Sequence, residues 1–76
     1  MIGMLRGHVE SVDAVSAIIE VGGVGYEVRM PSADLASMHA GQEIKVYTSL
    51  NVSQDAITLF GFGTLASKRM FLQLQK

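Results

Sequence analysis

The side chains that could act as acids, bases or metal ligands are few and scattered. The chain has two histidines, His8 and His39, seven carboxylates and no cysteine. No two of these groups lie at a spacing that implies one shared catalytic site. Without cysteine a thiolate metal site or a disulfide cannot form. The pattern therefore favours a protein without intrinsic enzymatic activity, cofactor or metal, in which both histidines are surface or strand-face residues.

A glycine-rich block, Gly22-Gly23-Val24-Gly25, invites comparison with phosphate-binding loops. It lacks a third glycine at the dinucleotide-binding spacing, and no helix is expected after it to supply a dipole for phosphate. Gly22 and Gly23 can both take positive φ, which a tight hairpin turn requires. We therefore expect a hairpin here, with Gly25 allowing a close neighbour to pack against the next strand.

Four aromatic residues could stack on unpaired bases, as aromatic residues of single-strand binders do. They are Tyr26, Tyr47, Phe60 and Phe62. Packing in the core is the alternative, and it is favoured for Tyr26, which shares a strand face with Val24 and Val28. Tyr47 lies on the opposite face from Val46, and its role stays open.

The polar stretch 51–56 offers a single acid, Asp55, beside amide and hydroxyl groups. Because apolar strand patterns flank it on both sides, we expect it to form a hairpin tip. On spacing alone, an ordinary solvated turn is the favoured interpretation, with a special role for Asp55 as the alternative.

Length and composition limit the class of protein. A chain of 76 residues forms one small domain at most, and its stability alone should be marginal. With 49% hydrophobic and 17% charged residues, it is not a disordered tail, and we expect apolar surface for a neighbour. Its net charge of −1 gives no bulk attraction for DNA phosphate. We expect neither a secretory signal nor a membrane helix, and the missing cysteines fit a reducing cytoplasm.

Alternating apolar residues predict five strands with one short helix after the third. The expected strands span residues 2–9, 14–21, 24–30, 44–50 and 57–62. Pro31 should end the third strand, because proline cannot donate to a sheet ladder. Ser32 is expected to cap a helix of about two turns that carries Leu35 and Met38 on one face.

This order of elements predicts an all-β fold, a five-stranded, partly open OB-fold Greek-key barrel whose short helix between strands 3 and 4 plugs one end. A plain meander sheet is the competing arrangement. From Thr64 the period changes to that of an amphipathic helix capped by Thr64. Because so short a helix is marginal alone, we expect a truncated chain, with an OB domain at 1–63 and a second domain's first helix at 64–76.

Three segments resemble one protein family. They are Met1-Ile2-Gly3-x-Leu5-x-Gly7, the block IEVGGVGYEV at residues 19–28, and Asp55-x-x-x-Leu59-Phe60-Gly61-Phe62. In their order and spacing they resemble the RuvA family, and the resemblance extends over essentially the whole chain, including Lys68-Arg69-x-Phe71. The chain is identified as the N-terminal part of a member of that family.

The resemblance implies a non-catalytic subunit that binds four-way DNA junctions in homologous recombination, DNA repair and the SOS response. It implies an OB-fold first domain and a second domain whose helix-hairpin-helix motifs, expected after Lys76, hold the junction's phosphates. A third domain would contact the ATPase motor RuvB. The other implied partners are the resolvase RuvC and further copies of the chain, in a homotetramer or paired tetramers in the cytoplasm.

In the family, an acidic pin before the last strand lies at the centre of the open junction, where four first domains meet. The matching positions are Gln54 and Asp55, so this sequence keeps the second of two usual acids. A carboxylate about 4 Å from a phosphate in water is disfavoured by about 1 kcal/mol, and four tips would repel the strands together. With Gln54 neutral, we expect the pin to depend more on steric bulk and on Asp55.

Two other interpretations stay open. A generic single-strand DNA binder needs a basic groove and exposed aromatic residues, which six scattered cations do not provide. An OB module that only oligomerises, with no direct contact to DNA, is harder to exclude.

Overall fold

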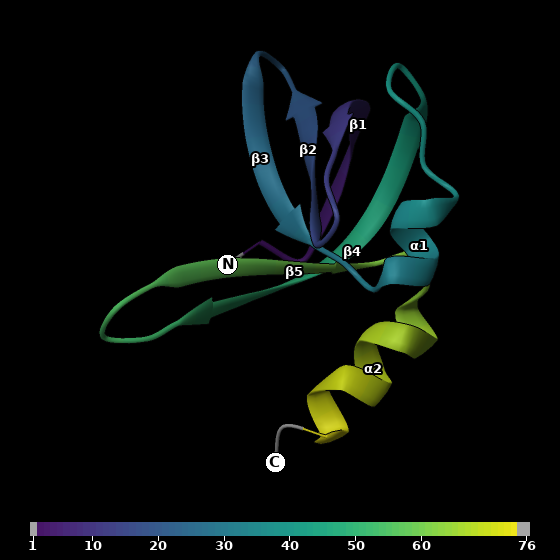
Figure 1. Cartoon of the computed structure of the whole chain (residues 1–76). Coiled ribbons are helices and arrows are strands. Elements are labelled where there is room, and N and C mark those ends of the chain that lie inside the picture. The colour runs from purple at the N-terminus through teal and green to yellow at the C-terminus, as the bar shows by residue number, and fades with distance from the viewer. Residues whose placement is uncertain (1, 75–76) are drawn as a thin grey trace.

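Five strands close into a barrel in the computed structural model, which describes residues 2–74 (Figure 1). The elements in chain order are β1 (Met4–Val12), β2 (Ser16–Val21), β3 (Val24–Arg29), α1 (Ser32–Ala36), β4 (Glu43–Val52), β5 (Ile57–Phe62) and α2 (Leu65–Leu74). The strands neighbour one another in the order β1-β2-β3-β5-β4, and β4 pairs again with β1. Only the β3–β5 pairing is parallel. This order is the predicted OB-fold Greek key, and it rules out the meander.

The turn between β2 and β3 accounts for the glycine-rich block. Gly22 has φ 58° and Gly23 has φ 90°, the combination that a type I′ hairpin turn requires. The Gly23 N–H donates to Oε2 of Glu20 at 2.6 Å. A Cβ atom at Gly25 would lie 3.2 Å from Cγ2 of Ile18, so the strand packs as closely there as expected. The hairpin prediction is confirmed.

The core lies inside the barrel and is closed at one end by the α1 segment. Its most deeply buried side chains come from four strands, and they are Val9, Ile19, Val28, Val46 and Thr48. Leu35 and Met38 join this cluster, as the predicted plug requires. Tyr26 is half-buried and packs against the same cluster, which confirms its predicted role in the core.

Helix α1 is shorter than predicted and begins differently. Ser32 is its first helical residue, and Pro31 occupies the N-cap position without a side-chain cap. The Pro31 carbonyl accepts the N–H groups of Asp34 and Leu35 at 3.0 and 3.1 Å. Proline suits a helix start because its fixed φ, −57° here, needs no reorganisation and it lacks an N–H to satisfy. The predicted Ser32 cap and two-turn length are therefore wrong.

Strand boundaries also differ from the alternation pattern. β1 continues to Val12 through an irregularity between Val9 and Ser11, and β2 begins only at Ser16. β4 includes Asn51 and Val52, which the sequence pattern assigned to the loop. Because these two residues pair with β5, the connecting loop shrinks to residues 53–56.

Helix α2 leaves the barrel after β5 and contacts it through the ring of Phe71. Thr64 Oγ1 accepts the Ser67 N–H at 3.1 Å, which confirms the predicted cap. The Phe71 ring lies 5.0 Å, centroid to centroid, from both Phe60 and Phe62. Residues 75 and 76 of the expected helix, and Met1 of the opening motif, lie outside the described residues.

Candidate nucleic-acid interface

The distal parts of β4 and β5 project from the barrel as an arm, which reaches furthest to the left in Figure 1. We define the hairpin arm as residues 51–58. Asn51 lies opposite Thr58, and Val52 lies opposite Ile57. Within residues 2–74 no other strand pairs with the residues of the arm. The arm therefore presents its tip well clear of the barrel.

The tip has a defined shape, set by Ser53 and Ala56. The Ser53 N–H donates to the Ala56 carbonyl at 2.8 Å. The Ser53 hydroxyl donates to the same carbonyl at 3.1 Å and accepts the Ala56 N–H at 3.2 Å. Gln54 and Asp55 occupy the two positions between these hydrogen-bonded residues, and both are exposed. The turn therefore directs the two predicted pin residues outward together.

Asp55 is the single charged residue of the hairpin arm. No ion pair recorded within residues 2–74 includes it. Its charge is therefore balanced by no side chain of the described chain and acts on whatever approaches the tip. The role of Gln54 and Asp55 as a pin that faces DNA stays a prediction.

An apolar pair lies directly behind the tip. Val52 is 69% exposed and its cross-strand partner Ile57 is 72% exposed. The alternation pattern does not reveal this pair, because it assigns Val52 to the loop and Ile57 only to the start of a strand. Their signal in the sequence is a β-branched residue on each side of the polar turn, which favours a longer hairpin.

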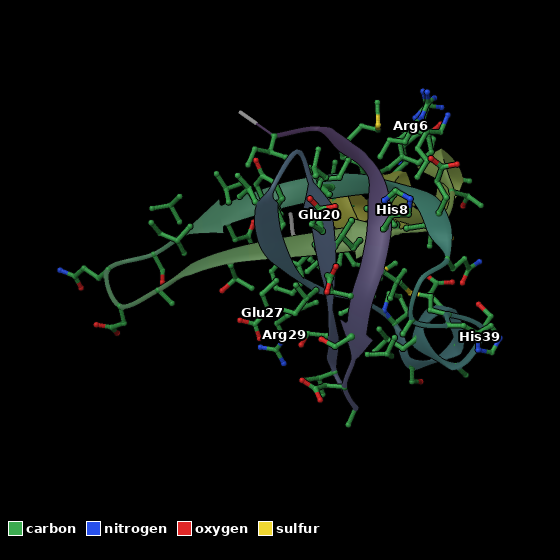
Figure 2. All side chains as sticks on the ribbon, turned by 90° about the horizontal axis from the view of Figure 1, so that it is seen from above. Arg6, His8, Glu20, Glu27, Arg29 and His39 are labelled. Atoms are coloured by element: carbon green, nitrogen blue, oxygen red, sulfur yellow. The ribbon has the colours of Figure 1, made fainter. Side chains whose placement is uncertain are left out.

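The other residues singled out by type are not brought together. Phe62 is buried and Phe60 is half-buried, and both rings pack against Phe71 of α2, whereas Tyr26 and Tyr47 lie on other strands. Figure 2 shows His8 on the barrel wall and His39 beyond α1, well apart. Among residues 2–74 no group of three or more histidine or acidic residues could hold a metal ion.

Most of the chain matches the model of one protein family. The model of the RuvA N terminal domain matches residues 1–61. The chain belongs to this RuvA N-terminal domain family. The match spans the barrel up to the last residues of β5, and α2 follows it.

Relatives in several bacteria share more than the barrel. The chain is 68% identical over 76 residues to the Holliday junction branch migration complex subunit RuvA of Bifidobacterium animalis subsp. lactis, covering all of this chain and 37% of that protein. The RuvA subunit of Corynebacterium diphtheriae is 45% identical over 75 residues, which is 99% of this chain and 37% of that protein. The RuvA subunit of Bdellovibrio bacteriovorus is 44% identical over 78 residues, with 40% of it covered. The chain therefore spans well under half the length of these RuvA relatives.

No helix within the described part of this RuvA N-terminal domain has the length and apolar character needed to cross a membrane.

Proposed function

We propose that this chain is the first domain of a non-catalytic subunit that binds four-way DNA junctions in the cytoplasm during branch migration. The observation that carries the proposal is an unpaired carboxylate at the end of a projecting arm in a RuvA-family barrel. The similarity to RuvA proteins that are named as Holliday junction branch migration complex subunits supports it.

The domain division belongs to the same proposal. Residues 1–63 form the OB domain, and residues 64–76 begin a second domain that carries most of the DNA affinity. The greater length of the relatives supports this division. The exposure of Met70 (65%) and Leu74 (83%) on α2 supports packing of that helix against a further segment. A third domain contacts the motor RuvB, which hydrolyses ATP, and RuvC joins the complex as the resolvase.

The role of the tip follows from repulsion. Four copies in a tetramer bring four Asp55 carboxylates to the centre of an open junction, where each disfavours a phosphate about 4 Å away by about 1 kcal/mol in water. The strands are thereby held apart at the crossover. Gln54 adds bulk without charge, so this tip acts less through electrostatics than a tip with two acids, and salt screens it less.

The direct test compares Asp55→Asn with the wild type in the full-length subunit that carries this chain. A fluorescent base analogue at the crossover of a synthetic four-way junction reports unpaired bases. We expect Asp55→Asn to reduce the fluorescence rise on binding, with junction affinity unchanged or higher because one negative charge is lost. The matched control is Asp13→Asn, an exposed acid in the turn between β1 and β2. Equal behaviour of the two variants would reject a DNA-facing pin and favour the oligomerisation-only alternative.

A second experiment tests the effect of having a neutral residue, Gln54, where an acid is usual in the family. Gln54→Glu restores a second acid at the tip, and we expect branch migration by the full-length protein with RuvB to become more sensitive to salt. Migration rates measured from low to high salt would show the change. Identical rates and an identical salt response would mean that the charge at this position does not matter.

A further inference from the structure

The outer wall of the barrel formed by β1 and β4 carries a second arrangement of charge, distant from the tip. Strand alternation directs Arg6 and His8 outward from β1, and Glu43 and Lys45 outward from β4. The register places Arg6 opposite Lys45 and His8 opposite Glu43. Figure 2 shows Arg6 and His8 on this wall, far from the end of the hairpin arm.

Two like charges therefore lie directly opposite each other on neighbouring strands. Arg6 and Lys45 are both exposed, and no ion pair recorded within residues 2–74 includes either. Like charges at directly opposite positions in a sheet destabilise it. In the described chain this pair has no carboxylate within ion-pair distance to relieve the repulsion, so a bound anion would relieve it.

The neighbouring side chains position the cations. Nζ of Lys45 lies 5.3 Å from the ring centroid of Tyr47, within the range of a cation–π interaction. Tyr47 is half-buried, so the ammonium group rests against a fixed surface. Arg6 and Lys45 also line a shallow hollow together with Glu43 and Ile44. The two cations thus flank one depression in the wall.

The wall is polarised along the strands. Beyond the Arg6–Lys45 pair, His8 lies opposite Glu43, and His8 Nδ1 is 3.9 Å from Oε1 of Glu20 on β2. Glu10 follows on β1 and is exposed. Positive charge is therefore confined to one end of the wall, which limits contact with a polyanion to that end.

We propose that Arg6 and Lys45 bind phosphates of the DNA backbone on the outer wall of the barrel. This inference rests on the proposed function, because the polyanion is then an arm of the junction. Arginine and lysine side chains hydrogen-bond to the phosphate oxygens of DNA. The site adds a local attraction to a chain whose net charge of −1 gives none in bulk.

DNA is favoured over a second protein surface by the composition of the wall. Protein–protein interfaces have cores depleted of charged residues, lysine and glutamate in particular. Protein–DNA interfaces are more polar and more positive. The side chains around the pair are mostly polar or charged, namely Glu43, His8 and Tyr47, and Met4 (46% exposed) is the large apolar neighbour.

The test measures the salt dependence of DNA binding by the full-length subunit with Arg6→Gln and Lys45→Gln, singly and together. Each phosphate neutralised on duplex DNA contributes about 0.9 to the slope of log K against log salt concentration, so the double variant should lose about 1.8. Its fall in affinity between about 50 and 200 mM salt should then be roughly tenfold smaller than that of the wild type. The loss should be the same for a junction and for a linear duplex, because phosphate contacts carry no sequence or branch information.

Two matched controls sharpen the result. Arg29→Gln removes an exposed cation from β3 and should leave the slope unchanged, while Lys45→Arg keeps the charge and should keep the wild-type slope. Melting temperatures should not fall in the Gln variants, because like-charge repulsion is removed. An unchanged slope in the double variant, or an equal change in Arg29→Gln, would overturn the inference.

Failure of this inference differs from failure of the proposed function. A wild-type subunit that binds no junction would overturn both. A wild-type subunit whose Asp55-dependent opening persists, with no slope change in the double variant, would overturn the phosphate site alone. A smaller assembly of the double variant by light scattering, with its DNA slope intact, would assign the pair to a contact between copies and also overturn it.

Discussion

Strands β4 and β5 run through two regions, the barrel and the hairpin arm, which differ in how far their side chains are buried. Within the barrel, Val46 and Thr48 are fully buried and Leu59 is 8% exposed. In the arm, a few residues further along the same strands, Val52 and Ile57 are 69% and 72% exposed. The alternation of side chains is the same in both regions. The difference is that barrel strands have neighbours on both edges, whereas the two arm strands pair only with each other.

Stability and the proposed function belong to different regions of the molecule. A two-stranded hairpin is at best marginally stable in water, so the arm depends on the barrel for its position. Apolar burial, which is the main stabilising contribution to folding, is concentrated inside the barrel. Residues at the tip can therefore be replaced with little change in the free energy of folding, so their identity can be set by what the tip contacts.

The largest effect is expected where two barrel strands approach most closely. A Cβ atom at Gly7 would collide with the backbone carbonyl oxygen of Glu20 and lie 2.8 Å from Cγ2 of Val21. The backbone cannot move aside without disturbing the β1–β2 pairing. We therefore expect Gly7→Ala to lower the free energy of unfolding by about 3 kcal/mol or more, measured by urea denaturation.

The control for this prediction is Gly3→Ala. A Cβ atom at Gly3 meets nothing within 4 Å, so this variant should stay within about 0.5 kcal/mol of the wild type. Similar losses in both variants would show that β1 is sensitive to any added methyl group, and that close approach at Gly7 is not the cause.

A smaller effect is expected at the buried hydroxyl of β4. Thr48 is 0% exposed, and its Oγ1 donates to the Ile2 carbonyl at 2.9 Å, which fixes the start of the chain to the barrel. Thr48→Val keeps the shape but removes this hydrogen bond. We expect a loss of about 1 to 2 kcal/mol in unfolding free energy, with faster amide exchange in residues 2–5.

Thr58→Val makes the same substitution in the arm. Thr58 is half-buried and lies in the hairpin arm, where β4 and β5 pair only with each other. Thr58→Val should therefore change the free energy of unfolding by less than about 0.5 kcal/mol. If the two variants lose equal stability, the contrast between barrel and arm does not hold for polar groups.

Much of the barrel is predictable from local pattern. Alternation identifies Val28 and Val46 as inward-facing, and spacing identifies Leu35 and Met38 as a plug. The paired glycines specify the β2–β3 turn because this turn requires positive φ, which few residues other than glycine adopt readily. These features depend on residues that are close in the sequence, which is the range over which patterns carry information.

Most of the features that the sequence pattern misses are set by residues that are distant in the sequence. The end of β4 depends on pairing with β5, so Val52 could not be assigned from its own neighbours. The Arg6–Lys45 pair depends on the register that closes the barrel between β1 and β4, which alternation does not specify. The Ser32 cap is a local error of another kind, because the carbonyl of the adjacent Pro31 already accepts N–H groups of the first turn of α1.

The candidate site shows the same division. Spacing alone favours an ordinary turn for Gln54 and Asp55, and only the resemblance to a family assigned them a role. The structure adds that they occupy the exposed end of a projecting arm. The proposed contact with DNA would involve other copies of the chain and the junction, and no pattern within one chain encodes these.

The smallest effect is expected at the apolar pair behind the tip, and it tests the comparison most directly. Val52→Thr with Ile57→Thr keeps β-branching, and therefore strand propensity, while removing apolar surface. Because both side chains are exposed in the single chain, the double variant should unfold within about 0.5 kcal/mol of the wild type in urea denaturation. A loss that is much larger, and that grows with protein concentration, would show that the pair is covered in solution by another copy, since association stabilises by mass action. In that case the arm would contribute to assembly as well as presenting Asp55.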